Sequence, residues 1–188
     1  MRTVTQLCLS LALLAGTSSG QRTFPEFDRA DEETVRLLPG AFDDLSSSVR
    51  EELERRGCTI PQVYPGVERS NIVRGRFTAP DQIDIAVLCS RERVSSILIF
   101  QEESTTVVAE LASAPDRNYL QGIGGGVIGF SRALGVASPR YIQEHYEAFG
   151  GPEPPPLDHD GVNDAFVGKA SVVWYWYEGQ WLQLTGAD

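Results

Sequence analysis

The residues best suited to chemistry lie in one short acidic segment, Asp158-His-Asp-Gly-Val-Asn-Asp164. Asp158 and Asp160 stand at alternate positions, a glycine permits a sharp turn, and Asp164 follows further on. Short loops surround Ca²⁺ with oxygen ligands spaced in this way. The pattern predicts Asp158, Asp160 and Asp164 as calcium ligands. The alternative is that the same carboxylates only form a hydrogen-bonded turn at the start of a strand.

A second candidate is the serine of Val127-Ile-Gly-Phe-Ser-Arg-Ala133. This spacing has the form of a nucleophile elbow, in which Ser131 would follow a strand and precede a helix. The other members of a catalytic triad would be Asp158 or Asp160 and His145 or His159. Ala133 replaces the usual second glycine, and the strands expected before Ser131 are joined as hairpins rather than through crossover helices. A small secreted serine-type hydrolase is therefore the alternative function, not the leading one.

The third candidate is the aromatic run Trp174-Tyr-Trp-Tyr177, with Trp181 across a predicted hairpin. In a strand, Trp174 and Trp176 point to one face and the two tyrosines to the other. An exposed row of rings would stack on sugars or contact a protein partner. The alternative is a central strand that is buried on both sides.

The first twenty residues have the order of a secretory signal peptide, residues 1–20. Arg2 provides a positive charge, residues 7–14 form an apolar run, and small residues follow up to Gly20. The run is about eight residues long, well below the roughly 20 that a helix needs to cross a bilayer. We therefore expect a secreted or periplasmic protein with no stable membrane insertion.

The charge balance restricts the partners. The chain has 16 basic and 26 acidic residues, a net charge of −10. Nucleic acids and anionic lipids repel such a protein, so no nucleic-acid partner is expected. A cation, a basic protein or a neutral glycan is a more natural ligand. The Gly124-x-Gly-x-x-Gly129 spacing has the form of a dinucleotide-binding fingerprint. It lacks the strand–helix context of such a site, so no dinucleotide cofactor is expected and calcium is the one candidate cofactor.

Two cysteines remain after the expected cleavage, Cys58 and Cys89. In an oxidising compartment such a pair normally forms a disulfide. Closing a loop of about 30 residues stabilises a fold by about 3–4 kcal/mol on the chain-entropy account. Two separate buried thiols are the alternative.

Two helices and a set of strands must position these groups. Leu45, Val49 and Leu53 form one apolar stripe and predict a helix over residues 44–56, capped by Asp44 and stopped by Gly57. Ser138-Pro139 opens a second helix over 139–149, where His145 is expected at the surface.

Short β-rich runs predict an antiparallel meander, covered on both faces, at residues 71–77, 83–89, 95–100 and 106–111. Three further strands are expected at 165–168, 171–177 and 180–184. Residues 21–40 are expected to form an irregular leader, followed by a single domain over 41–188. The predicted fold class is α+β, with antiparallel sheets, two flanking helices and the Cys58–Cys89 disulfide.

The stretch from Asp158 to Leu184 resembles the FG-GAP or VCBS type of β-propeller repeat, in which an Asp-rich loop leads into a strand and a hairpin. A degenerate copy of this pattern runs from Arg74 to Gln101. The resemblance implies that Asp158, Asp160 and Asp164 are metal ligands. Pro156 departs from the pattern, which has a further carboxylate or amide there. Two copies do not close a propeller, which needs about four blades.

The segments 57–62 and 181–188 also look like those of uncharacterised bacterial secreted proteins, a resemblance that implies no activity. The leading interpretation is therefore an exported, non-catalytic binding or structural module. Its ligand would be a protein or a glycan, and calcium would stabilise it.

Overall fold

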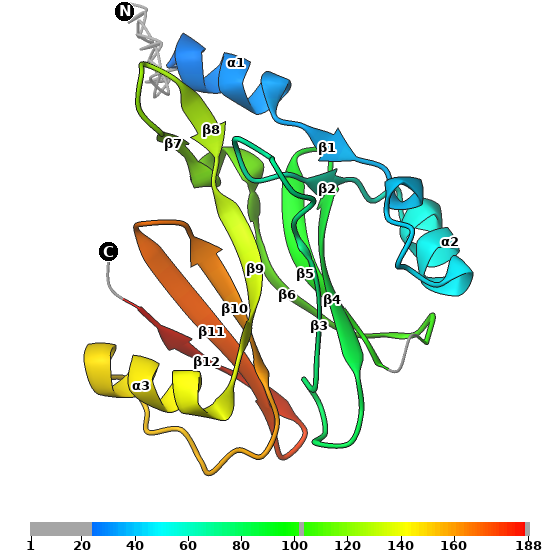
Figure 1. Cartoon of the computed structure of the whole chain (residues 1–188), viewed down its shortest axis with the longest axis vertical. Helices are drawn as coiled ribbons and strands as arrows, with labels where there is room; N and C mark the ends of the chain where they lie inside the picture. The colour runs from blue at the N-terminus through cyan, green and yellow to red at the C-terminus, as the bar shows by residue number, and fades with distance from the viewer. Residues whose placement is uncertain (1–23, 102–103, 187–188) are drawn as a thin grey trace, which may run out of the picture.

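The computed structural model describes residues 24–101 and 104–186, so the predicted signal peptide, residues 1–20, lies outside the described residues (Figure 1). The first half contains, in chain order, α1 (Pro25–Glu33), β1 (Arg36–Leu37), η1 (Pro39–Ala41), α2 (Ser47–Arg55), β2 (Ile60–Pro61), β3 (Ile72–Gly75), β4 (Asp84–Arg91) and β5 (Val94–Phe100). The second half contains β6 (Val107–Pro115), η3 (Asp116–Tyr119), β7 (Leu120–Gly122), β8 (Ile128–Phe130), β9 (Arg132–Ala137), α3 (Pro139–Phe149), β10 (Gly161–Phe166), β11 (Ala170–Tyr177) and β12 (Gln180–Thr185). The predicted α+β class, with antiparallel sheets, is confirmed.

The predicted meander is the first of two four-stranded sheets, with strand order β3-β4-β5-β6 and every pairing antiparallel. The second sheet has the order β12-β11-β10-β9. The sequence does not predict its strand β9, because residues 127–133 have the form of a nucleophile elbow, which expects a helix after Ser131. Two small two-stranded sheets, β1-β2 and β7-β8, lie beside the main sheets (Figure 1).

Both predicted helices are confirmed with small shifts. In α2 the cap is Ser46, whose hydroxyl accepts from the Val49 amide, and not Asp44 as expected. Gly57 ends this helix with a φ of +71°, as predicted. In α3 the Ser138 hydroxyl accepts from the Tyr141 amide, and Pro139 is the first helical residue.

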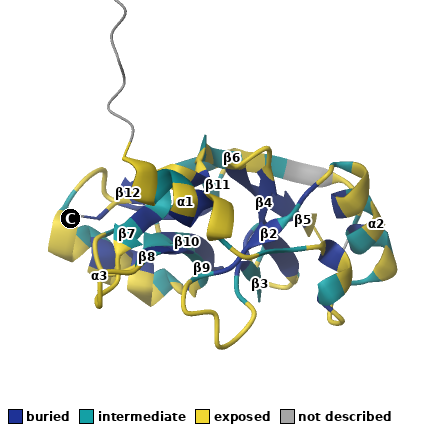
Figure 2. Cartoon of the chain, turned by 90° about the horizontal axis from the view of Figure 1, so that it is seen from above, coloured by how far each residue is buried: buried dark blue, intermediate teal, exposed yellow. Residues whose placement is uncertain are grey.

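The expectation of an irregular leader over 21–40 is wrong for residues 25–33, which form α1. This helix starts at Pro25 with acidic residues in its first turn, a favourable arrangement at a helix N-terminus. Its polar composition hid it in the sequence, since just two of its residues, Ala30 and Asp31, are buried. Figure 2 shows α1 with one side exposed above the buried strands.

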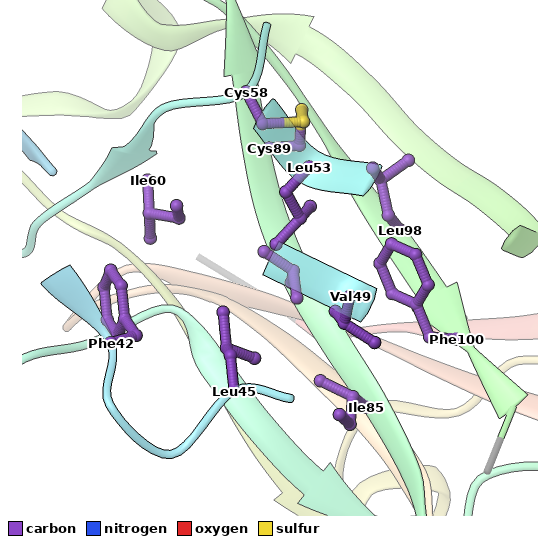
Figure 3. Close-up of a cluster of buried hydrophobic side chains, with 11 residues drawn as sticks. Phe42, Leu45, Val49, Leu53, Cys58, Ile60, Ile85, Cys89, Leu98 and Phe100 are labelled. Atoms are coloured by element: carbon purple, nitrogen blue, oxygen red, sulfur yellow. A yellow bond between two sulfur atoms is a disulfide. The ribbon is translucent and has the colours of Figure 1, made fainter. Parts of the chain in front are cut away.

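The meander is buried on both faces because its strands alternate between two hydrophobic clusters. Ile85, Val87 and Cys89 of β4 point toward α2, where they contact Val49 and Leu53. The predicted disulfide joins Cys58, just after α2, to Cys89 in this layer (Figure 3). It closes a loop of 31 residues. The chain-entropy account gives such a loop about 3–4 kcal/mol of stabilisation.

The opposite face of the meander packs against the second sheet. Ala86, Leu88, Ile97 and Ile99 share a buried cluster with Val162 of β10. Leu134, Trp174 and Trp181 from the second sheet pack against the same cluster. The core of the protein therefore lies between α2 and the first sheet and between the two sheets, and a third buried cluster lies between α3 and the second sheet. Among the described residues, no helix has both the length and the apolar character needed to cross a membrane.

The charged side chain of Arg132 lies fully buried between the sheets. Arg132 of β9 has no exposed surface and forms two 2.8 Å hydrogen bonds with the carboxylate of Asp164 in β10. It also donates to the carbonyl and hydroxyl oxygens of Ser95 in β5 and to the carbonyl oxygen of Ala112 in β6. Tyr119 covers the guanidinium at 4.4 Å from the ring centroid. Arg132 therefore links both sheets through a neutralised and fully hydrogen-bonded contact.

Replacing Arg132 alone is expected to destabilise the fold strongly. Arg132→Met leaves the Asp164 carboxylate buried without its partner, which typically costs about 3–5 kcal/mol. The double variant Arg132→Met/Asp164→Leu removes both charges, so it is expected to recover most of that loss. Urea unfolding followed by circular dichroism measures both free energies of unfolding.

The control is Arg140→Met, which breaks the exposed pair of Arg140 with Glu144 on α3. Exposed pairs contribute about 0–1 kcal/mol. A single Arg132 variant as stable as this control, or a double variant no more stable than Arg132→Met, would contradict the assignment.

Candidate functional site

The acidic segment proposed for calcium is engaged in separate pairings. Asp164 binds Arg132, and Asp160 Oδ2 accepts hydrogen bonds from the backbone and side chain of Arg76 at 3.1 and 3.4 Å. Asp158 Oδ1 lies 2.9 Å from Nδ1 of His159, and this hydrogen bond holds the pKa of Asp158 below its ordinary value.

A calcium ion at these carboxylates would have to displace two arginines. Within residues 24–101 and 104–186, no three His, Cys, Asp or Glu side chains are grouped so as to hold a metal. Calcium binding by Asp158, Asp160 and Asp164 stays a prediction. The same ion pairs fit the alternative interpretation, in which these carboxylates stabilise the start of β10.

The expected nucleophile elbow is wrong in its geometry. Ser131 joins two strands, β8 and β9, instead of preceding a helix, and it is buried. Its hydroxyl lies 3.3 Å from the carbonyl oxygen of Gly129. His159 Nε2 lies 2.9 Å from the carbonyl oxygen of Trp176. The hydrogen bonds of these residues do not assemble a triad around Ser131.

His145, expected at the surface, is buried on α3. Its Nε2 lies 3.2 Å from the Ser171 hydroxyl, and its ring packs against Phe149 with centroids 4.9 Å apart. The amphipathic α3 rotates this side chain toward the second sheet, where Ile142 is also buried. Burial lowers the pKa of His145 below its ordinary value.

The tryptophans belong to the packing between the sheets. Trp174 and Trp181 contact the inter-sheet cluster, while Trp176 meets Trp181 edge-on with centroids 5.7 Å apart. Tyr175, on the opposite face of β11, is buried beneath α3. This arrangement agrees with the interpretation of a central strand covered on both sides. Sugar binding by Trp174, Trp176 and Trp181 stays a prediction.

The structure contains a cleft that the sequence patterns did not reveal. Its volume is about 480 Å³, and three separate segments form its walls. The lining residues are Ala30, Glu33, Thr34, Val35 and Leu37 from α1 and β1, residues 62–69 from the loop after β2, and residues 127–130 at β8. Figure 1 shows α1, β1 and β8 gathered at the same end of the molecule. We name this feature the apolar cleft.

Arg36 fixes the first wall of the apolar cleft. Its guanidinium donates to the backbone carbonyl and the carboxylate of Asp31 in α1, at 2.8 and 2.7 Å. It also donates to Asp116 in η3 at 3.0 Å, and the Ser90 hydroxyl lies 2.6 Å from that same carboxylate oxygen. The partly buried Arg36 guanidinium therefore attaches α1 and β1 to the end of the first sheet.

Side-chain hydrogen bonds close the base of the loop over 62–69. Gln62 accepts from the Ser70 amide at 2.9 Å and donates to the Ser70 carbonyl oxygen at 3.3 Å. Asn71, which follows Ser70, donates to the carbonyl oxygens of Pro61 and Arg132. The loop is thereby fixed at its base by both flanking strands, although its tip is exposed.

The third wall depends on a glycine. The Tyr64 amide donates to the Phe130 carbonyl oxygen at 2.9 Å, which brings the loop against β8. A Cβ atom at Gly129 would lie 2.7 Å from the Tyr64 Cβ atom. Only glycine therefore permits this approach of the loop to β8.

Exposed apolar side chains surround the opening of the apolar cleft. Val67 is 89% exposed, Val35 59%, Tyr64 48% and Val127 40%. Single exposed apolar residues are common on protein surfaces, but a group of them at one cleft makes that cleft a candidate interaction site. In the sequence, Tyr64 and Val67 lie in a loop rich in proline and glycine, which is the one local signal of the site.

Changing Gly129 is expected to disrupt the cleft. Gly129→Ala forces Tyr64 away from β8, and overpacking of this kind costs about 1–3 kcal/mol. The matched control is Gly122→Ala in the neighbouring strand β7, where an added Cβ atom meets nothing within 4 Å. Urea unfolding compares the two variants. Equal unfolding midpoints would show that the close contact at Gly129 is not real.

The buried His145 predicts a pH dependence of stability. The unfolded chain takes up a proton at about pH 6.5, whereas the folded protein keeps the ring neutral to lower pH. The free energy of unfolding therefore falls as the pH drops below about 6.5, until the folded state is also protonated. In His145→Gln this part of the slope disappears. An unchanged slope between pH 7.5 and 5 in urea titrations would contradict the burial of this ring.

No protein family matches the chain, and neither the curated proteins nor the solved structures contain a match. The resemblances to FG-GAP or VCBS repeats and to uncharacterised secreted proteins stay predictions.

Proposed function

We propose that the protein is an exported, non-catalytic binding module that holds an apolar ligand in the apolar cleft. The Cys58–Cys89 disulfide supports export, because such bonds persist in oxidising compartments. The signal-like order of residues 1–20 points the same way. A secreted or periplasmic location is part of this proposal.

The observation that carries the proposal is the combination of exposed apolar side chains with firmly held walls. Fully burying one side chain such as valine is worth about 1.5–3 kcal/mol. Val35, Tyr64, Val67 and Val127 together can therefore offset a substantial part of the cost of association. Because hydrogen bonds of Arg36, Gln62 and Asn71 already fix the base of the walls, less conformational entropy is lost when a ligand enters.

Calcium binding at the acidic segment would stabilise the module independently of ligand binding in the cleft. It does not involve the apolar cleft, since Asp158, Asp160 and Asp164 do not line it. The binding function proposed here therefore holds with or without a bound ion.

A neutral apolar fluorophore, N-phenyl-1-naphthylamine, tests the binding site. The folded protein is expected to bind it saturably, and Val67→Asp is expected to weaken the affinity about tenfold, which is about 1.4 kcal/mol. Placing a charge at the opening makes the cleft costly for an apolar probe. Fluorescence titration provides both dissociation constants.

The matched control is Ile83→Asp, because Ile83 is 53% exposed and does not line the apolar cleft. This variant is expected to bind the probe as the unchanged protein does. Equal affinities of the Val67 and Ile83 variants, or no saturable binding at all, would argue against a ligand site at the cleft.

A further inference from the structure

The rim of the apolar cleft is acidic. Glu33 and Glu68 both line it and are exposed. The one ion pair of Glu33 among the described residues is with Arg29, at 3.8 Å and largely exposed to water, where such pairs contribute little. The Glu68 side chain makes no hydrogen bond or ion pair with any residue that the structure describes. Two carboxylates are therefore available at the opening.

Arg69 also lines the apolar cleft, but its guanidinium contacts residues 41–43 instead of the carboxylates at the opening. Arg69 donates to the carbonyl oxygen of Ala41, lies 4.0 Å from the Asp43 carboxylate and covers the Phe42 ring at 5.8 Å. Its charge is thus engaged at η1 and the residues that follow. The chain as a whole is acidic, with a net charge of −10.

The tip of the loop also offers main-chain groups. In the described part of the chain, no residue hydrogen-bonds to the backbone N–H or C=O of Val67 or Glu68. These groups lie next to the most exposed apolar side chain of the opening. A peptide backbone can pair with them while its side chains enter the cleft, which is a recurring mode of peptide recognition.

From these observations we infer that the apolar cleft binds a peptide segment of a partner protein that carries apolar residues next to lysine or arginine. The apolar residues cover Val35, Tyr64 and Val67, and the basic residue faces Glu33 and Glu68. This inference rests on the proposed binding function and adds the chemistry of the partner.

Three synthetic peptides of equal length test the inference by fluorescence anisotropy at low salt: alternating leucine and lysine, alternating leucine and glutamate, and alternating serine and lysine. The leucine–lysine peptide is expected to bind at least ten times more tightly than either of the others. The double variant Glu33→Gln/Glu68→Gln is expected to lose at least threefold of that affinity, and binding is expected to weaken with added salt.

The control is Glu51→Gln/Glu54→Gln, which removes the same charge from exposed positions on α2 and is expected to change the affinity less than twofold. Equal binding of the leucine–glutamate peptide, or equal effects of the two double variants, would overturn the inference that the partner is basic. The apolar ligand site tested by the fluorophore would be unaffected by that result. Equal binding of the serine–lysine peptide would show plain charge attraction and would also overturn it. If neither leucine peptide binds and Val67→Asp leaves the fluorophore affinity unchanged, the proposed function itself fails.

Discussion

The guanidinium group of Arg132 is the contact on which the arrangement of the two sheets depends. A buried arginine is tolerated only where every donor has a partner and a carboxylate balances the charge. Asp164, Ser95 and Ala112 provide those partners from three strands. Ala112 adopts a φ of +52°, which turns its carbonyl oxygen to the arginine at a bulge in β6. The position of one sheet relative to the other is therefore specified by hydrogen bonds and not by apolar packing alone.

The same stretch of chain connects this contact to the apolar cleft. Residues 128–137 provide Phe130 and Gly129 to the cleft and, directly afterwards, Arg132 to the space between the sheets. Asn71 binds the carbonyl oxygen of Arg132 and accepts from the Leu134 amide, and it also closes the loop over 62–69. The cleft is thus built on the same segment that carries the buried Arg132 contact. Walls that are held at their base in this way would lower the entropy cost of the proposed binding.

The elements with clear periodicity could be predicted from the sequence, and the long-range contacts could not. Helix α2 follows from the four-residue spacing of Leu45, Val49 and Leu53, and the meander from alternating β-branched runs between short turns. The disulfide follows from the count of cysteines. Helix α1 was missed because a polar helix that buries two residues has almost no apolar stripe.

The candidate sites show the limit more sharply. Asp164 belongs to a calcium-like spacing, but its partner Arg132 lies in a segment with the form of a nucleophile elbow. No local pattern states that the two segments are neighbouring strands. The apolar cleft is likewise formed by residues near positions 35, 64, 67 and 127, which only the folded chain brings together. Charge pairing and surface clustering are tertiary properties, so they become visible in the structure.

The most direct test of the central claim is a titration of the ¹⁵N-labelled protein with the leucine–lysine peptide, followed by amide chemical shifts. The account predicts shift changes confined to residues 33–37, 62–69 and 127–130, with the strands around Arg132 unaffected. Changes centred on the Trp174–Trp181 hairpin, or on the acidic segment 158–164, would contradict it.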